Sequence, residues 1–384
     1  LGPAAGWTGL TQLTMNGNAV HDLSPLAGLT SLSRLDLDRN PVADLTPLAA
    51  LGNLYSLSLN ATGVSDLGPL AGLTKLGTLS AAGNAIEDIG PLAACVAMTS
   101  LDLTANGIGD IGALAGMTAM KTLLLSQNPI ADIAALTGLA QLRRVDIANA
   151  RIEEIGPLAG KTKLTNLLLS YNRIATLPPA MNLPALVWLW LDNNRLDDAG
   201  PLASLYALQY VDLSGNVLVD PTPLSSLAGN YYLNLGNNRV ETIASLLNNP
   251  GLDWLVALDN PLDEDSRETD IPALVQRGVR VQFDDALESD TVAQVSPGTP
   301  FLCAGSPGGP FTPGAMVYTL TNTGADIVYC DVWSGYKRVG FWNESSLSSI
   351  VTPQERLSVT LAGFTSVNID VYPLPSLATV LAGD

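Results

Sequence analysis

The sequence predicts an α/β solenoid in its first three quarters and a small all-β sandwich in the remainder. A motif recurs every 22 residues without insertion, an alternating Leu-x-Leu segment stands in each copy, and near residue 285 the repeat gives way to short strand-like segments. With 47% apolar and 14% charged residues, the 384-residue chain can fill a continuous core. We expect a solenoid over 1–285, a linker over 286–299 and a β-domain over 300–384.

An asparagine marks each repeat. It follows an alternating segment, as Asn40 follows Leu35-Asp-Leu37. Alternation is the period of a short strand with one buried face, and because one copy cannot bury that face alone, copies must stack. Each asparagine amide is expected to bond backbone groups of its own and the neighbouring coil. The column comprises Asn18, Asn40, Asn84, Asn106, Asn128, Asn172, Asn194, Asn216, Asn238 and Asn260, with Thr62 and Ala150 in the two vacant steps.

The segment after each asparagine is expected to form the opposite wall as short helical turns or extended coil, because prolines such as Pro25 and Pro47 restrict its backbone. Four residues after the asparagine column stands an acidic side chain, which can accept the free N–H groups of such a turn. Capping explains this spacing without an ion, so we prefer it to a calcium ladder. The acidic column comprises Asp22, Asp44, Asp66, Asp88, Asp110, Asp132, Glu154, Asp198 and Asp220.

Residues 263–283 are expected to cap the last coil. The acidic, hydroxyl-rich start, the early Pro272 and the closing Gly278 fit a short helix, and the alternation after it fits one final strand. The acidic run lacks the Asp-x-Asp-x-Asp-Gly pattern of a calcium loop. We predict no metal site and no cofactor.

These repeats resemble the leucine-rich repeat family. The 22-residue period and the wording Asp-Leu/Ile-x-Pro-Leu-Ala-x-Leu-Thr are similar to its internalin-like bacterial branch, over about residues 10–285. The resemblance implies a horseshoe with a parallel sheet on the concave side, a function in binding, and a secreted or cell-surface location. It does not identify the ligand.

The segment beyond residue 300 carries the signals of antiparallel strands separated by turn formers. Regular short strands of this kind suggest a small sandwich. The candidate strands are Met316–Leu320, Ile327–Trp333, Leu357–Leu361 and Val367–Tyr372.

Residues 305–313 and 318–324 resemble an immunoglobulin-like accessory domain of secreted bacterial proteins, which implies a spacer, an anchor or a docking platform. Where relatives often carry Trp after Asn-Thr-Gly, this chain has Cys330, and on that ground we suspect a disulfide with Cys303. Bonded and free thiols both stay open, and a bond would indicate an oxidising compartment. The apolar tail 373–384 is either a free end or a strand lent to a neighbouring molecule.

Aromatic side chains gather on the predicted concave face of the last repeats. Residues between the buried leucines point outward, and in the first five repeats they are small or polar. In repeats nine to twelve one column is aromatic, and strands about 4.8 Å apart would give a strip roughly 15 Å long. The predicted ligand-binding residues are Tyr171, Trp188, Trp190, Asp192, Tyr210, Asp212, Tyr232, Asn234, Trp254 and Asp259.

Three interpretations of this face stand side by side. Exposed aromatics with carboxylates are typical of a recognition site. The rings could instead only stack on one another, or another domain or a second chain could cover them.

Catalysis is a poor fit. The chain has a single histidine, His21, expected on the convex surface, and the lone Cys95 is expected in the core. The concave carboxylates Asp102, Asp146 and Asp212 lie on non-adjacent repeats, and nothing in the sequence suggests a raised pKa for them. We predict no enzyme.

The partner is expected to be a protein. With 36 acidic and 18 basic residues, net charge −18, the chain lacks the basic footprint of a nucleic-acid or anionic-lipid binder, and no apolar run is long enough to cross a membrane. A glycan is the second candidate, because Trp and Tyr faces also suit sugar rings. The alternative from another class is a structural subunit of a surface fibre or layer, self-assembling through the β-domain and its tail.

Overall fold

The computed structural model describes residues 5–284 and, further on, the backbone of seven strands between Phe301 and Pro373. The chain divides into two compact units, Leu1–Asp285 and Ala286–Asp384, and each is described by itself. Within the described residues, no helix combines the length and the apolar character that a bilayer crossing needs.

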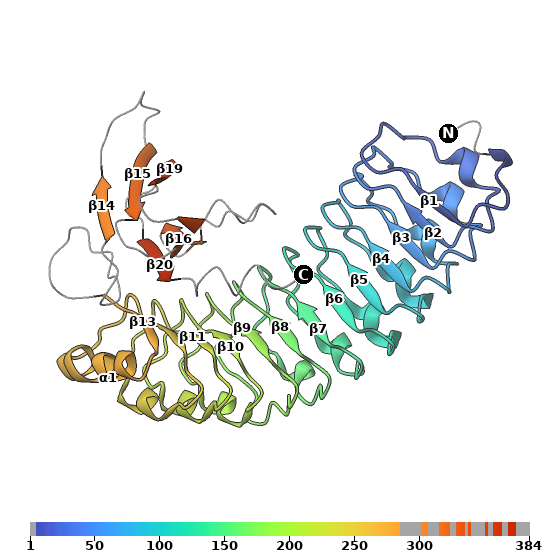
Figure 1. Ribbon diagram of the computed structural model, residues 1–384. Coiled ribbons are helices and arrows are strands. Elements are labelled where there is room, and N and C mark those ends of the chain that lie inside the picture. The colour runs from blue at the N-terminus through green and yellow to red at the C-terminus, as the bar shows by residue number, and fades with distance from the viewer. Residues whose placement is uncertain are drawn as a thin grey trace, which may run out of the picture. The chain divides into compact units, whose positions relative to one another are not determined.

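The first unit is built on a parallel sheet of thirteen short strands in chain order. Each strand pairs with the strand of the next repeat, as Leu13 pairs with Leu35, so the predicted stacking is confirmed. Figure 1 shows these strands along the inner, concave side of the arc. They are β1 (Gln12–Thr14), β2 (Arg34–Asp36), β3 (Ser56–Ser58), β4 (Thr78–Ser80), β5 (Ser100–Asp102), β6 (Thr122–Leu124), β7 (Arg144–Asp146), β8 (Asn166–Leu168), β9 (Trp188–Trp190), β10 (Tyr210–Asp212), β11 (Tyr232–Asn234), β12 (Trp254–Val256) and β13 (Arg280–Gln282).

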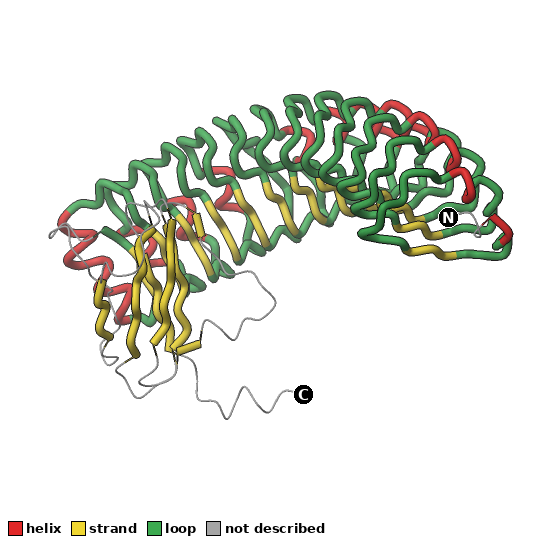
Figure 2. Tube along the Cα trace, turned by 90° about the horizontal axis from the view of Figure 1, so that it is seen from above, coloured by secondary structure: helices red, strands yellow, loops and turns green. Residues whose placement is uncertain are grey.

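The opposite wall consists of short 3-10 turns and extended coil, as expected. Figure 2 shows the strands side by side on one wall and mainly loops on the other. The turns are η2 (Ser24–Leu26), η3 (Thr46–Leu48), η4 (Gly68–Leu70), η5 (Gly90–Ala94), η6 (Gly112–Gly116), η7 (Ala134–Leu136), η8 (Gly156–Leu158), η9 (Gly200–Ser204), η10 (Thr222–Ser226) and η11 (Ala244–Asn248).

The aspartate column caps these turns. The Asp22 carboxylate accepts the Ser24 N–H at 2.8 Å, and Asp44 accepts the Thr46 N–H at 2.8 Å in the next coil. The same bond recurs from Asp66, Asp88, Asp110, Asp132, Asp198 and Asp220. These hydrogen bonds lower the pKa of Asp22 and Asp44, because they favour the charged carboxylate. The capping prediction is confirmed for these eight aspartates, whose carboxylates serve the fold. Glu154, the remaining member of the acidic column, makes no such hydrogen bond in the described chain.

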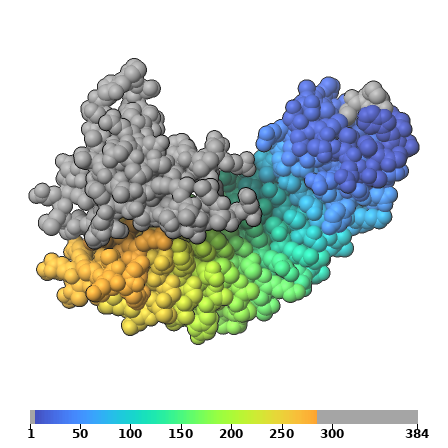
Figure 3. Space-filling view, in the orientation of Figure 1, coloured from blue at the N-terminus to red at the C-terminus, as the bar shows by residue number. Residues whose placement is uncertain are grey.

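The core lies between the two walls and runs without interruption from coil to coil. On the outer face seen in Figure 3, the coloured coils follow one another in chain order from blue to orange. Side chains at the centre of the strands, such as Leu35 and Leu57, are fully buried, each worth roughly 1.5–3 kcal/mol. Cys95 also lies in this core, as expected, and His21 is exposed.

The asparagines form the expected ladder. The Asn40 amide donates to the Leu37 carbonyl of its own coil at 2.9 Å and to the Met15 carbonyl of the previous coil at 2.8 Å, and its oxygen accepts the Val20 N–H at 3.0 Å. Thr62 substitutes in part, because its hydroxyl donates to the Leu59 carbonyl at 2.8 Å.

The predicted cap is confirmed. One turn of π-helix, η12 (Ser266–Asp270), runs into helix α1 (Ile271–Gln276), and Gly278 takes the left-handed conformation, φ 95°, that ends the helix. Strand β13 then pairs with β12 and closes the sheet.

The second unit contains two antiparallel sheets. One has the order β14-β15-β19, and in the other β16 pairs with β17, β18 and β20. The strands are β14 (Phe301–Gly305), β15 (Ala315–Asn322), β16 (Val328–Ser334), β17 (Lys337–Arg338), β18 (Ile350–Val351), β19 (Arg356–Ala362) and β20 (Asn368–Pro373). The side chains of Cys303 and Cys330, the linker 286–299 and the tail beyond 373 lie outside the described residues, so those predictions stay predictions.

Candidate ligand-binding face

Four aromatic side chains form a row across β9–β12. Strand register places Trp188 beside Tyr210, Tyr210 beside Tyr232, and Tyr232 beside Trp254. We call this row the aromatic strip. Its members point outward because the next residue on each strand, such as Leu189 after Trp188, points into the core, and successive strand residues face opposite sides.

The rings of the aromatic strip contact one another in pairs. Trp188 and Tyr210 are stacked, with centroids 3.9 Å apart and planes 12° apart. Tyr232 and Trp254 meet edge to face at 5.2 Å and 87°. Such pairs contribute about 0.5–1.5 kcal/mol each beyond their buried area. Stacking is therefore part of what these residues do.

Stacking does not account for the whole surface, because large aromatic area stays exposed. Trp188 is 36% exposed, and Trp190, the last residue of β9, is 39% exposed. Tyr171 is 45% exposed and takes a left-handed conformation, φ 57°. Arg39 and Gln127 take the same conformation at the equivalent step of other coils, so the left-handed φ belongs to the repeat. The exposed ring is what distinguishes Tyr171.

The next row combines an indole with a carboxylate and an amide. Register places Trp190 beside Asp212, and Asp212 beside Asn234. The Asp212 carboxylate accepts the Ser214 N–H at 2.9 Å and the Ser214 hydroxyl at 2.6 Å on one oxygen, and the Asn234 amide at 3.1 Å on the other. These bonds hold the carboxylate in one orientation, on the strand residue that is in register with Trp190.

Asp192 lies one coil before Asp212 and couples to it. The Ser170 hydroxyl donates to one of its carboxylate oxygens, and the Asn193 amide donates to the other at 2.8 Å. We call Asp192 and Asp212 the acidic pair. Burial and, next, the charge of Asp192 raise the pKa of Asp212 from 3.8 to about 6. The expectation that no concave carboxylate has a raised pKa is therefore wrong for Asp212, because the sequence does not show desolvation.

Tyr171 belongs to the same cluster. Burial first, and then the charges of Asp192 and Asp212, raise the pKa of its phenol. The structure thus brings together Tyr171, Trp190 and the acidic pair, all four predicted from the sequence. Asp259 does not join them. It stands three coils further on, exposed, and donates its backbone N–H to Asp284.

Two residues of this face were missed by sequence reasoning. The Tyr231 ring approaches Tyr210 with centroids 5.7 Å apart, and the Arg280 guanidinium lies 5.9 Å from the Trp254 ring. Arg280 also pairs with Asp253 at 3.1 Å. Tyr231 directly precedes β11 and so lies outside the alternation that marks outward-facing strand residues. Arg280 belongs to the cap, and its place beside Trp254 follows from the pairing of β13 with β12.

A second aromatic feature lies in the first repeats, where no anchor was expected. Gln12, Ser33, Arg34, Tyr55, Ser56 and Thr78 line an open hollow of about 590 Å³. Tyr55 is exposed and its ring lies across Gly77, where a Cβ would come within 2.3 Å of it. This hollow has one aromatic ring, against the several gathered on β9–β12.

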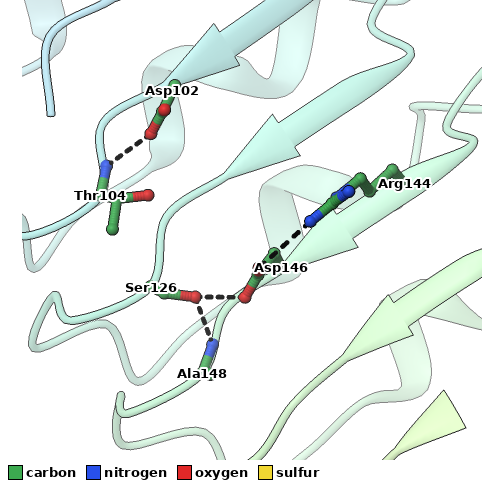
Figure 4. Close-up of polar contacts among 6 residues, drawn as sticks. All are labelled: Asp102, Thr104, Ser126, Arg144, Asp146 and Ala148. Atoms are coloured by element: carbon green, nitrogen blue, oxygen red, sulfur yellow. Dashed lines mark hydrogen bonds and ion pairs between the residues drawn. The ribbon is translucent and has the colours of Figure 1, made fainter. Parts of the chain in front are cut away.

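The concave carboxylates of β5 and β7 serve local hydrogen bonds (Figure 4). Asp102 accepts the Thr104 N–H at 3.0 Å. Asp146 accepts the Ser126 hydroxyl and lies 3.9 Å from Arg144 on its own strand. Strand order places β6 between β5 and β7, so these carboxylates do not meet. The described residues also contain no group of three or more ligating side chains that could hold a metal ion.

Comparison with known proteins supports the repeat assignment. The family profile described as Leucine Rich repeats (2 copies) matches residues 8–50. No curated protein matches the chain. Among solved structures, an internalin (inlF) from Listeria monocytogenes is 28% identical with a TM-score of 0.66, over 72% of this chain and 83% of that chain.

Two further structures share the fold. The functional domain of InlJ from Listeria monocytogenes is 17% identical with a TM-score of 0.56, over 96% of this chain and 91% of that one. An Arabidopsis thaliana membrane receptor kinase ectodomain, solved in complex with CASPARIAN STRIP INTEGRITY FACTOR 2, is 22% identical with a TM-score of 0.58, over 67% of this chain and 36% of that one. The first unit is therefore a leucine-rich repeat solenoid, and its structural neighbours include internalins from Listeria.

Proposed function

We propose that this chain is a secreted or cell-surface binding protein that recognises a protein partner through the concave face of β9–β12. The observation that carries the proposal is the exposed aromatic area of Trp188, Trp190 and Tyr171 beside the acidic pair. Interface hot spots are enriched in Trp and Tyr, and such residues dominate binding energy. The receptor ectodomain among the similar structures was solved with a bound partner, which is consistent with this use of the fold.

A scaffolding role suits the chemistry better than catalysis. The concave carboxylates Asp102 and Asp146 are separated by a strand and engaged locally. The acidic pair does lie together, but each of its carboxylates is held by hydrogen bonds from serine and asparagine side chains of the coils. The second unit, which we propose to be an immunoglobulin-like spacer or anchor, would hold the solenoid at the surface. The fibre alternative depends on the β-domain and the tail 373–384, and the tail beyond 373 lies outside the described residues. No specific contact favours this alternative or a glycan partner.

The test uses the full chain and a displayed library of random 16-residue peptides. Clones selected on the wild-type protein would be measured against the double variant Trp188→Ala/Trp190→Ala and against Tyr206→Ala. Tyr206 is the matched control, because it is 68% exposed and lies just after η9 on the outer wall. Losing hot-spot aromatics costs about 2 kcal/mol or more, hence over tenfold in Kd.

We expect the selected clones to lose more than tenfold affinity for the double variant and to keep their affinity for Tyr206→Ala. Far-UV circular dichroism would verify that both variants fold. Clones that bind the folded double variant as tightly as the wild type would refute the proposed face.

A further inference from the structure

The chain itself shows how this face accommodates an arginine. At the β12–β13 end of the aromatic strip, the Arg280 guanidinium lies 5.9 Å from the Trp254 ring and 3.1 Å from the Asp253 carboxylate. An indole face and a carboxylate together satisfy both the planar and the charged character of a guanidinium. Here the chain supplies the arginine from its own cap.

The β9–β10 end has the same ingredients, and within residues 5–284 no arginine pairs with its carboxylates. Trp190 stands beside Asp212 in register, and Tyr171 lies within electrostatic reach of Asp192 and Asp212. The ion pairs among the described residues are Arg144–Asp146, Arg173–Glu153 and Arg280–Asp253, so neither carboxylate of the acidic pair takes part in one. Two carboxylates thus share a half-buried site with an exposed indole and an exposed phenol.

The groups that face Asp212 come from four successive coils. Asp192 and Tyr171 precede it, Ser214 stands on its own coil, and Asn234 follows it. Of these, only Asp192 is charged, and it repels Asp212. This repulsion is uncompensated inside the described chain, so a cation from outside would be favoured at this position.

We propose that an arginine of the protein partner is held at this position. Its guanidinium would donate hydrogen bonds to the carboxylates of Asp192 and Asp212 and lie between the side chains of Trp190 and Tyr171. This inference rests on the proposed function, since it concerns the same face. Charge complementarity selects a cation, and the flat aromatic faces favour a guanidinium over an ammonium, which is a compact and more strongly hydrated charge. The burial that raises the pKa of Asp212 also strengthens its attraction to a cation once the carboxylate is ionised.

The experiment uses peptide libraries with a fixed central Arg, Lys, Gln or Glu and Gly, Ser, Tyr and Trp randomised around it. Capture by the full chain would be measured at pH 7.5 and pH 5.0. The variant Asp192→Asn/Asp212→Asn removes both charges and keeps side-chain size. The control variant Asp102→Asn/Asp146→Asn removes two other concave carboxylates on β5 and β7, and Asp212→Asn alone guards against misfolding of the double variant.

We expect Arg-centred peptides to be captured about tenfold better than Gln-centred ones at pH 7.5, with Lys intermediate and Glu weakest. The preference should vanish in the acidic-pair variant, shrink in Asp212→Asn and persist in the control. It should also shrink at pH 5.0, because Asp212, with a pKa of about 6, is then mostly protonated.

Equal capture of Arg- and Gln-centred peptides by the wild type, or an Arg preference that survives in the acidic-pair variant, would overturn the inference. If captured peptides still depend on Trp188 and Trp190, the proposed binding face stands and only the arginine site fails. If no captured peptide depends on either aromatic residue, both fail. Binding of a glycan array through Trp190 without any peptide capture would likewise overturn a protein arginine as the occupant.

Discussion

Replacing Asn128 by alanine removes one amide of the asparagine ladder next to the step where Ala150 already interrupts it. The Asn128 amide donates to the Leu103 and Leu125 carbonyls, each at 2.9 Å, and its oxygen accepts the Ile108 N–H at 3.0 Å. Asn106 also donates to the Leu103 carbonyl, at 2.9 Å. In the described chain no second side-chain amide reaches the Leu125 carbonyl, because the next step is Ala150.

Asn194 provides the matched comparison inside an uninterrupted part of the ladder. Its two acceptors, the carbonyls of Leu169 and Leu191, each receive a second amide, from Asn172 and Asn216 at 3.0 Å. Asn194→Ala therefore leaves only the Ile174 N–H unsatisfied.

The difference between these two variants follows from counting buried groups without a partner. One such group costs about 1–3 kcal/mol. Asn194→Ala should therefore destabilise by about 1–3 kcal/mol and Asn128→Ala, which strands two groups, by about 2–6 kcal/mol. Ala150→Asn should rescue Asn128→Ala by about 1–3 kcal/mol, because it returns an amide to the Leu125 carbonyl, and should stabilise the wild type by less.

Urea unfolding of the full chain, followed by circular dichroism, measures the free energy of unfolding of the wild type, the two alanine variants, Ala150→Asn and the double variant. The comparison requires that the slope of this free energy against urea concentration is the same in all five proteins. Equal losses in Asn128→Ala and Asn194→Ala, or no extra rescue by Ala150→Asn, would refute this account of the ladder.

Three further outcomes follow from single sites. Asp212→Asn should stabilise the protein at pH 7.5 by about 1–3 kcal/mol and should not stabilise it at pH 4. The pKa of Asp212 is about 6 in the folded state and near 3.8 in the unfolded state, so the free energy of unfolding of the wild type falls as pH rises between these values. A difference in urea midpoints that does not change with pH would contradict this. Gly251→Ala should lower the free energy of unfolding by more than about 2 kcal/mol, because its Cβ would lie 2.2 Å from the Ala228 carbonyl oxygen. Gly72→Ala, whose Cβ would meet open space, should be near neutral. Similar melting temperatures of the two variants would disprove the clash. Lys161 is 4% exposed, its ammonium donates to a backbone carbonyl at 2.5 Å, and burial lowers its pKa, so the free energy of unfolding of the wild type should rise with pH in the alkaline range. Lys161→Leu should remove that rise and add about 1–3 kcal/mol to the free energy of unfolding at pH 7. A destabilised Lys161→Leu variant would count against this prediction.

Most of the fold was predictable from local sequence patterns. A fixed period of 22 residues forces equivalent residues into equivalent places, so one reading of Leu35 and Asn40 applies to every coil. The capping bond from Asp22 to Ser24 spans two residues, and the strand, turn and cap were predictable for the same reason. The ladder also follows, because coils in register place each amide next to its neighbour.

The candidate site was predictable only as a column. Register aligned Trp188 with Tyr210 as expected, yet the sequence did not show that Arg280 closes one end of the aromatic strip, or that Tyr231 joins it. These contacts depend on side-chain direction and on the register of the cap.

The sequence by itself determined the period, the strands, the ladder and the row of aromatic residues, because each is a local or repeated relation. Only the tertiary structure decided which rings stay exposed and which carboxylates interact. Desolvation and charge repulsion at Asp212 depend on every atom packed around it, from Asp192 in the coil before to Asn234 in the coil after. A pKa, unlike a period, is a property of the assembled surroundings.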